Sequence, residues 1–228
     1  MNHPELPKVL IPLNGTPIVL KLAQEISKIQ LAYPPVVSVC FKHEMVEEVL
    51  GQKYIYAYAS PDRTGTAHAV AAAKPKISAS NVVILYGDMP FIKAESILKL
   101  ITLHEQTNSI FSMFTATVED YTGRNEPLYT YGRIIRQEGK ILAIRELPDA
   151  SDTEKIIQEV NPGIYAFNTQ WLWDHIDLVQ KNSHGEYYLT DLAEIAIREG
   201  VNIQTAGIDP AETFGINTPK QLEQAVKL

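Results

Sequence analysis

The stretch Val82-Val83-Ile84-Leu85-Tyr86-Gly87-Asp88 carries the strongest structural signal in the chain. Its first five residues are apolar or aromatic, a composition typical of a strand that is covered on both faces in a parallel sheet. In such sheets ligands bind outside the carboxyl ends of the strands, which is where Gly87 and Asp88 stand in this sequence. The polar residues that follow predicted strands are therefore the first candidates for chemistry.

Strands and helices alternate around this stretch. Apolar residues recur at three- and four-residue spacing after Pro17, which predicts a helix that begins there. Residues 36–41 are nearly all apolar and predict a second buried strand. The other elements predicted in the first half are a helix over 45–50, a strand over 54–59, a helix over 66–73 and a helix over 94–105. This order predicts an α/β fold with an open, mostly parallel sheet and helices on both faces.

The second half of the chain predicts shorter strands and antiparallel pairing. Residues 137–140, Gln-Glu-Gly-Lys, predict a hairpin turn between short strands over 133–136 and 141–145. We therefore expect a single Rossmann-like, mononucleotide-binding α/β domain over residues 1–228, with an antiparallel elaboration after residue 110. The further elements predicted are strands over 110–118, over 163–167 and near Ile203, a loop over 121–127, and helices over 170–179, over 188–198 and after Pro219.

The composition excludes several classes of protein. Of the 228 residues, 45% are hydrophobic and 21% are charged, which argues against a disordered or fibrous chain. With 20 basic and 27 acidic residues the formal net charge is −7, whereas an extended nucleic-acid surface needs a basic face. We expect no nucleic-acid partner. An anionic small molecule is compatible with this charge, because a lysine, backbone amides or a metal can hold it locally.

The cysteine content and the first residues bear on the cellular compartment. Cys40 is the single cysteine, so the chain forms no intrachain disulfide, and its place in an apolar run predicts that it is buried. Residues 1–5 lack the basic and long apolar regions of a signal peptide. No stretch approaches the ~18 apolar residues of a membrane span. These observations favour a cytoplasmic protein without a membrane partner.

Three polar residues from distant parts of the sequence are candidates for binding phosphate or metal. A carboxylate at Asp88 can hold Mg²⁺ beside a phosphate, although a turn aspartate is the commoner explanation of a lone Gly-Asp pair. The ammonium of Lys8 can neutralise a phosphate, although most lysines are solvated. The amide oxygen of Asn217 can ligate a hard cation, or the residue simply caps the final helix.

Other polar residues are candidates for binding a nucleotide or a sugar. Residues 63–69, Arg-Thr-Gly-Thr-Ala-His-Ala, place Gly65 and Thr66 at a helix N-terminus, where backbone amides can meet a base, ribose or phosphate. Thr66 equally serves as a helix cap. Glu146 and Asn161 end predicted strands and can hydrogen-bond sugar hydroxyls, although polar residues at strand ends are commonly only solvated.

Seven short segments, in order along the chain, carry a family resemblance. They are residues 6–10 (LPKVL), 65–69 (GTAHA), 85–90 (LYGDMP), 131–134 (YGRI), 158–161 (QEVN), 185–191 (GEYYLTD) and 215–217 (GIN). Together they resemble the uridylyltransferase (pyrophosphorylase) domain of bacterial N-acetylglucosamine-1-phosphate uridylyltransferases, within the nucleotide-sugar pyrophosphorylase family. The segments span almost the whole chain, and the run over 185–191 points to the N-acetylglucosamine branch.

The resemblance implies a reaction and a set of roles. The reaction is UTP plus N-acetylglucosamine 1-phosphate giving UDP-N-acetylglucosamine and pyrophosphate. The resemblance implies that Lys8 and Asp88 are catalytic and that Mg²⁺ is held by Asp88 and Asn217. It further implies that the nucleotide contacts Lys8, Ser60, Gly65, Thr66 and Asp88, and that the sugar contacts Tyr86, Gly87, Gly132, Glu146 and Asn161.

The sequence departs from the family in three respects. The family opens with an apolar strand and a glycine-rich loop ending in Gly-Thr-Arg-Met, and this sequence starts about where that methionine stands, so the strand, the loop and the catalytic arginine are expected to be missing. Ser60 stands where the family usually has a uracil-reading glutamine, and Pro148 where a lysine is usual. The β-helix acetyltransferase domain of the bifunctional enzymes is absent from the sequence, so acetyl transfer is not expected.

These departures shape the functional hypotheses. We expect little or no activity from the chain as given, and backbone groups left unpaired where the first strand would lie in the sheet. Two other hypotheses stay open: a non-catalytic module that binds a nucleotide-sugar, and a pyrophosphorylase for another sugar 1-phosphate or another base. Calorimetry with a UDP-sugar tests the first, and a substrate panel tests the second.

Overall fold

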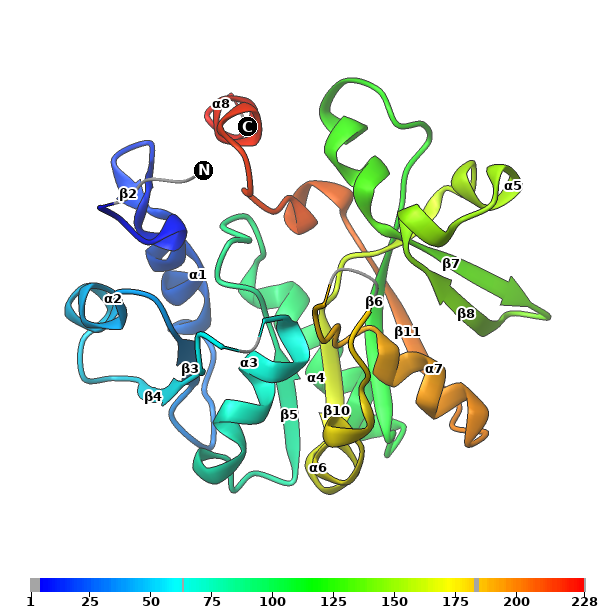
Figure 1. The fold of residues 1–228 in the computed structure, drawn as a ribbon, viewed down its shortest axis with the longest axis horizontal. Helices are drawn as coiled ribbons and strands as arrows, with labels where there is room; N and C mark the ends of the chain where they lie inside the picture. Colours follow the sequence, from blue (N-terminus) through cyan, green and yellow to red (C-terminus); the bar gives the residue numbers. More distant parts are fainter. Residues whose placement is uncertain (1–4, 63, 183–184, 228) are drawn as a thin grey trace.

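The computed structural model describes residues 5–62, 64–182 and 185–227, and its centre is a seven-stranded sheet (Figure 1). The strands lie in the order β5–β10–β6–β9–β7–β8, and β11 pairs with β6. Their bounds are β5 (Asn81–Ile84), β6 (Phe111–Thr117), β7 (Gly132–Gln137), β8 (Lys140–Arg145), β9 (Glu159–Asn161), β10 (Tyr165–Asn168) and β11 (Gln204–Ile208).

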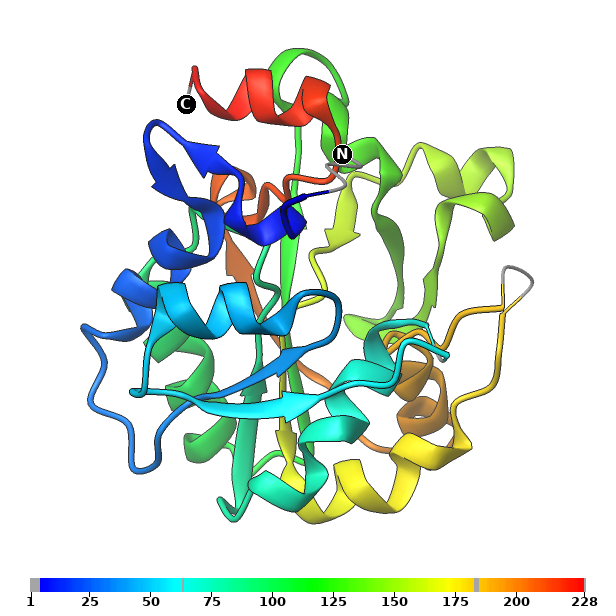
Figure 2. The ribbon, with the colours of Figure 1, turned by 60° about the vertical axis from the view of Figure 1, so that its left-hand side comes forward.

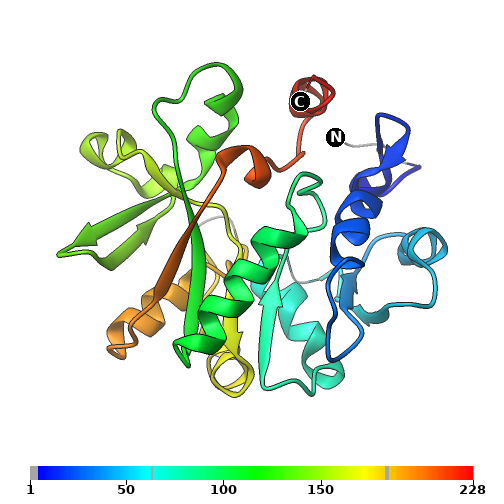
Figure 3. The same cartoon turned by 180° about the vertical axis from the view of Figure 1, so that it is seen from behind.

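Helices cover both faces of this sheet, so the predicted α/β fold class is confirmed. In β6, Phe111 packs into one core and Phe114 into the other, as the two-residue alternation of a strand requires. The first core is closed by α6 (Thr169–His175) and α7 (Asp191–Arg198). The second is closed by α4 (Ala94–Gln106), which lies across the sheet in Figure 3.

The N-terminal segment packs beside the large sheet (Figure 2). Among the described residues, the parallel strands β3 and β4 pair only with each other, and β5 pairs only with β10, so no strand joins the two sheets. The elements of this segment are η1 (Lys8–Leu10), β1 (Pro12–Leu13), β2 (Thr16–Pro17), α1 (Ile18–Ile26), β3 (Val36–Val39), α2 (His43–Leu50), β4 (Ile55–Tyr58) and α3 (Thr66–Ala73).

Parallel pairing is less extensive than the sequence predicts. Within the described strands, β3 pairs with β4 and β6 with β11 in parallel, whereas β10 runs antiparallel to both of its neighbours, β5 and β6. The chain reaches β10 only after the antiparallel strands β7, β8 and β9, and then inserts it between β5 and β6. β5 and β6 therefore still point the same way, and the loop after β5 lies at the edge where the candidate site forms.

Several elements differ from the sequence-based predictions. The hairpin β1–β2 and the short helix α5 (Asp152–Lys155) are additional, whereas β9 ends at Asn161, where the sequence predicts a strand to end. The 3-10 turn η3 (Gly123–Thr130) occupies most of the predicted loop over 121–127. The prediction that Cys40 is buried is wrong, because β3 ends at Val39 and Cys40 is exposed in the turn before α2. The remaining elements are α8 (Pro219–Ala225) and the 3-10 turns η2 (Lys74–Lys76), η4 (Leu147–Asp149), η5 (Ile176–Leu178) and η6 (Pro210–Thr213).

None of the helices in the described ranges is long and apolar enough to cross a membrane.

A buried arginine holds the antiparallel part of the sheet together. Arg133 on β7 is fully buried, and its guanidinium donates hydrogen bonds to the carbonyl oxygens of Tyr129, Tyr131 and Lys155. The same group lies 4.7 Å from the ring centroid of Tyr121 and 5.0 Å from that of Tyr129. Carbonyl dipoles and aromatic faces therefore surround the charge.

Replacing Arg133 by methionine is expected to lower the free energy of unfolding by about 3 kcal/mol or more, because three carbonyl groups would lose their donors at about 1–3 kcal/mol each. Urea denaturation measures this loss. The control is Arg145→Met on the neighbouring strand. Arg145 is exposed and pairs with Glu154 at 3.5 Å, so its replacement should lower the free energy of unfolding by about 1 kcal/mol or less. Equal losses in the two variants would contradict the structural role given to Arg133.

Candidate active site

A pocket of about 500 Å³ opens beside the loop that follows β5. Segments from the whole length of the chain line it, from η1 near the N-terminus to the loop before α8. Nine of the eleven site residues predicted from sequence lie in its wall: Lys8, Thr66, Tyr86, Gly87, Asp88, Gly132, Glu146, Asn161 and Asn217.

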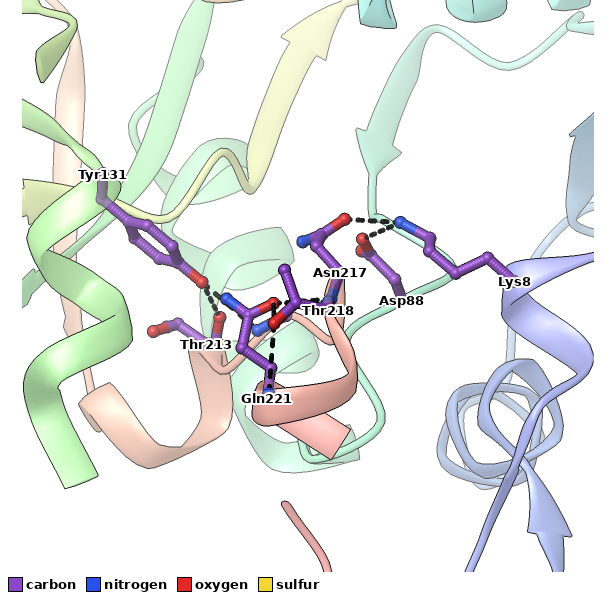
Figure 4. A network of polar contacts seen from close by, with 8 residues as sticks. Lys8, Asp88, Tyr131, Thr213, Asn217, Thr218 and Gln221 are labelled. Atoms are coloured by element: carbon purple, nitrogen blue, oxygen red, sulfur yellow. Dashed lines mark hydrogen bonds and ion pairs between the residues drawn. The ribbon is translucent and has the colours of Figure 1, made fainter. Parts of the chain in front are cut away.

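Three of these side chains meet at one end of the pocket (Figure 4). The ammonium of Lys8 lies 2.7 Å from Oδ2 of Asp88 and 2.6 Å from Oδ1 of Asn217. The backbone fixes this arrangement, because the amide of Ile216 donates to the carbonyl oxygen of Asp88 at 2.9 Å. The carboxylate and the amide oxygen are therefore neighbours in space and share one cation, the ammonium.

The loop that carries Asn217 is held on both sides. The Tyr131 hydroxyl donates to the carbonyl oxygen of Thr213 at 2.6 Å and accepts from the amide of Gly215 at 3.3 Å. Burial is the main cause that raises the pKa of Tyr131 to about 12, so the hydroxyl stays protonated. After Asn217, the Thr218 and Gln221 side chains form a capping box that starts α8.

These residues fit a magnesium ion. Mg²⁺ prefers oxygen ligands and is commonly held by one or two carboxylates together with substrate phosphates and water. Among the described residues there is no group of three or more His, Cys, Asp and Glu side chains that could hold a metal by themselves. An ion here would therefore bind to Asp88 and Asn217 and take its other ligands from phosphate and water, and the ammonium already found between the two oxygens indicates that a cation suits the position.

Glu146, Gly132 and Tyr86 form another part of the pocket wall, here called the sugar end. Burial raises the pKa of Glu146, and the nearby charges of Asp191 and Asp149 raise it further, while a hydrogen bond from the Thr190 side chain acts in the opposite direction. A Cβ on Gly132 would lie 3.2 Å from Oε1 of Glu146, so a larger residue would crowd the carboxylate. This end combines a carboxylate, amide groups and an aromatic ring, which are the groups that bind sugar hydroxyls and sugar faces.

Asn161 is locked in place at the sugar end. Its Oδ1 accepts a hydrogen bond from the amide of Gly163 at 3.0 Å, and its Nδ2 donates to the hydroxyl of Tyr165 at 2.7 Å. The amide orientation is thereby set, and within the described parts of the chain one Nδ2 hydrogen remains for another acceptor.

Two predicted nucleotide-binding residues do not line the pocket. Ser60 is exposed after β4, and its Oγ accepts from the amide of Asp62 at 3.3 Å. Gly65 is covered by Tyr187, whose backbone a Cβ on Gly65 would strike. Arg63, the first residue of this predicted segment, lies outside the described residues.

The start of α3 is engaged by the segment that precedes α7. The amide of Ala67 donates to the carbonyl oxygen of Tyr187 at 3.0 Å, and the amide of Leu189 donates to Oγ1 of Thr66 at 2.8 Å. The Thr66 side chain is also hydrogen-bonded to Tyr86. The helix cap predicted for Thr66 is not seen, since no side-chain hydrogen bond caps α3.

Four further residues at the site were not predicted from the sequence: Gly163, Tyr131, Tyr165 and Thr190. Gly163 has a positive φ of 81°, and a Cβ there would lie 2.5 Å from Cε2 of Tyr86. A glycine directly after the Asn161-Pro162 pair was the available signal, because such a position often marks a turn or a close approach.

If the pocket binds a nucleotide-sugar, as the resemblance implies, replacing Gly163 by alanine is expected to weaken that binding about tenfold or more. The methyl group would displace the Tyr86 ring from the pocket wall and strain the backbone by about 1–2 kcal/mol. Isothermal calorimetry with UDP-N-acetylglucosamine measures the affinity. Gly139→Ala is a matched control, because Gly139 has a φ of 80° and nothing within 4 Å of an added Cβ. It should lose similar stability and keep its affinity. An unchanged affinity in the Gly163 variant would show that Tyr86 does not contribute to ligand binding.

Proteins of known sequence and structure are similar to this chain. It is 36% identical to the bifunctional protein GlmU of Brevibacillus brevis over 226 residues, covering 97% of this chain and 47% of the relative. The bifunctional protein GlmU of Caldicellulosiruptor saccharolyticus is 38% identical over 230 residues, covering 97% of this chain and 48% of the relative. The chain thus spans about half the length of the curated relatives it matches.

Solved structures share the fold at low sequence identity. A nucleoside-diphosphate-sugar pyrophosphorylase from Vibrio cholerae superposes with a TM-score of 0.69 at 15% identity, covering 98% of this chain and 93% of that one. A CMP:2-keto-3-deoxy-manno-octonic acid synthetase complexed with CTP superposes with a TM-score of 0.69 at 16% identity, covering 96% and 90%.

The family resemblance seen in the seven segments is confirmed by these matches. A family model described as nucleotidyl transferase matches residues 4–207, and the chain therefore belongs to the nucleotidyl transferase family.

Proposed function

We propose that this protein transfers the uridylyl group of UTP to N-acetylglucosamine 1-phosphate and releases pyrophosphate. The observation that carries the proposal is the meeting of Lys8, Asp88 and Asn217 around one cation position, in the same pocket as Tyr86, Glu146 and Asn161. The first three suit a triphosphate and the second three suit a sugar. The identity of 36% to a bifunctional GlmU protein supports the choice of sugar within the family.

The proposed chemistry needs no covalent intermediate on the protein. A phosphate oxygen of the sugar 1-phosphate attacks the α-phosphorus of UTP, the bond between the α- and β-phosphates breaks, and pyrophosphate leaves with the electron pair. Both reactants are anionic, so catalysis rests on positioning and on neutralising charge. Mg²⁺ bound with UTP would supply part of that neutralisation.

The residues that line the pocket would bind different parts of the substrates. Asp88 and Asn217 would hold the metal through their oxygens, and Lys8, released from these oxygens, would bind a phosphate. At the sugar end, Glu146 would accept hydrogen bonds from sugar hydroxyls, Asn161 would donate one, and Tyr86 would lie against the sugar. Gly132 and Gly87 would leave room for the ligand.

The test is pyrophosphate release by this chain from each of the four nucleoside triphosphates with a panel of sugar 1-phosphates, with and without Mg²⁺. The expected result is a low rate that is highest with UTP and N-acetylglucosamine 1-phosphate and depends on a divalent ion. A higher rate with another pair would mean that the protein uses a different base or sugar. The base is tested first, because Ser60 stands where the family usually has a uracil-reading glutamine and does not line the pocket. If the protein binds UDP-N-acetylglucosamine but turns over no pair of substrates, it is a non-catalytic module that binds a nucleotide-sugar.

A further inference from the structure

A buried hydroxyl connects two walls of the pocket from beneath. Tyr165 on β10 is fully buried and does not itself line the pocket. Its Oη accepts a hydrogen bond from Nδ2 of Asn161 at 2.7 Å and donates one to Oγ1 of Thr190 at 3.5 Å. Thr190 lines the pocket and is hydrogen-bonded to Glu146. Strands β9 and β10 and the residue that precedes α7 thus meet at one oxygen atom.

The hydrogen bonds run in a single direction. The amide of Asn161 has hydrogens to give, each hydroxyl accepts one bond and donates one, and the carboxylate of Glu146 accepts the last. Aligned chains of this kind polarise one another, so the hydroxyl in the middle affects both ends. The long second bond, at 3.5 Å, has room to shorten when a ligand draws Glu146 or Thr190 toward it.

Packing alone does not explain a tyrosine at this position. The ring of Tyr165 meets Phe111 edge to face at a centroid distance of 5.5 Å and lies 5.9 Å from Phe167. A phenylalanine would fill the same space in this aromatic cluster. A buried hydroxyl costs free energy unless it is hydrogen-bonded, and this one is bonded to residues of the pocket wall.

We propose that Tyr165 is a positioning residue, whose hydroxyl orients Asn161 and, through Thr190, Glu146 for binding the sugar part of the substrate. The identity of the sugar substrate in this proposal rests on the proposed function, whereas the hydrogen bonds of Tyr165 to Asn161 and Thr190 do not. Tyr165 would touch neither substrate nor reacting atoms.

The first test replaces Tyr165 by phenylalanine and measures the KM of each substrate. The KM for the sugar 1-phosphate is expected to rise about fivefold to tenfold, the worth of a lost buried hydrogen bond, while the KM for UTP and the kcat change by about twofold or less. A parallel rise of both KM values, or no rise in either, would overturn the proposal.

A matched variant separates positioning from loss of stability. Tyr121→Phe removes a hydroxyl that donates to the carbonyl oxygen of Ile157, outside the pocket wall. It should lower the free energy of unfolding as Tyr165→Phe does and leave the KM for the sugar 1-phosphate unchanged. The same KM rise in both variants would make the effect of Tyr165 merely structural.

Thr190, in the middle of this hydrogen-bonded network, allows a rescue experiment. Thr190→Val removes the hydroxyl that connects Tyr165 to Glu146, and Thr190→Ser keeps it. The serine variant should retain the KM of the unaltered protein within about twofold, and the valine variant should raise it. Combined with Tyr165→Phe, the valine change should add less than its separate effect, because both break one connected network. Full additivity would overturn the connection through Thr190.

A measurement without substrate keeps the inference independent of the proposed function. In ligand-free protein, the side-chain amide hydrogens of Asn161 can be followed by NMR exchange with water. Their exchange should quicken about tenfold or more in Tyr165→Phe, since one hydrogen loses its acceptor. Unchanged exchange would overturn the proposal even for an active enzyme. Faster exchange would support it even where the unaltered chain turned over none of the sugar phosphates.

Discussion

If the proposed function holds, replacing Asp88 by asparagine should lower the rate of pyrophosphate release about a thousandfold, because the variant loses the negative charge that would hold a cation against the triphosphate, worth several kcal/mol in the transition state. Asparagine has the same shape and keeps one oxygen at the same place. The backbone carbonyl that accepts from Ile216 is unaffected by the change. The expected loss therefore reports on charge rather than on folding.

The measurements for this variant are kcat with UTP and N-acetylglucosamine 1-phosphate, and Mn²⁺ binding in the presence of UTP followed by electron paramagnetic resonance. Mn²⁺ binding should weaken in step with the rate. Asp152→Asn is the control, because the Asp152 side chain is 99% exposed, pairs with Lys155 and does not line the pocket. An Asp88 variant that retains a tenth of the rate would contradict the metal role.

Buried apolar runs made the framework of the fold predictable. The run over 82–86 and the apolar spacing after Pro17 correspond to β5 and α1, since burial on both faces or on one helical stripe leaves a pattern in the sequence itself. β9 leaves a weaker pattern that predicts only its end at Asn161, because it has three residues, of which Val160 and Asn161 are buried. The β1–β2 hairpin does leave one, since its turn residues Asn14 and Gly15 have positive φ and form the Asn-Gly pair typical of such turns.

Pairing and position at the site depend on contacts that are distant in sequence. Local spacing could not place Lys8 against both Asp88 and Asn217, and for each of the three an ordinary surface or turn role was the commoner explanation. The order of seven family segments supplied what spacing lacked. It did not reveal that Tyr187 covers Gly65, because this contact depends on the path of the backbone rather than on residue type.

The role of a buried tyrosine hydroxyl cannot be predicted from a hydrophobic pattern. Tyr165 and Phe167 occupy alternate positions of one strand and both pack in the same apolar cluster. A hydrophobic pattern treats the two alike. Only the neighbours of the hydroxyl, Asn161 and Thr190, distinguish a residue that packs from one that also orients a polar wall.

Replacing Lys8 by methionine should change two properties in opposite directions. The ammonium of Lys8 occupies the position between Asp88 and Asn217 at 2.7 Å and 2.6 Å, so a divalent ion must displace it to reach both oxygens. Methionine has similar length and no charge. In the absence of nucleotide, Mn²⁺ should therefore bind about tenfold more tightly to the variant, because the competing cation is gone and one carboxylate is left without its partner.

The rate of the same variant should fall about a hundredfold or more, because a phosphate would lose the ammonium that stabilises its charge during transfer. Lys99→Met is the control: Lys99 donates to the carbonyl oxygen of Gly207 at 2.6 Å, outside the pocket wall, and its loss should alter neither quantity. A slower enzyme with unchanged Mn²⁺ affinity would mean that the ammonium and the metal use different positions. Tighter metal binding together with slower transfer would mean that Lys8 keeps the two oxygens in place until the phosphates of the nucleotide draw it away, and that metal and nucleotide then enter the site together.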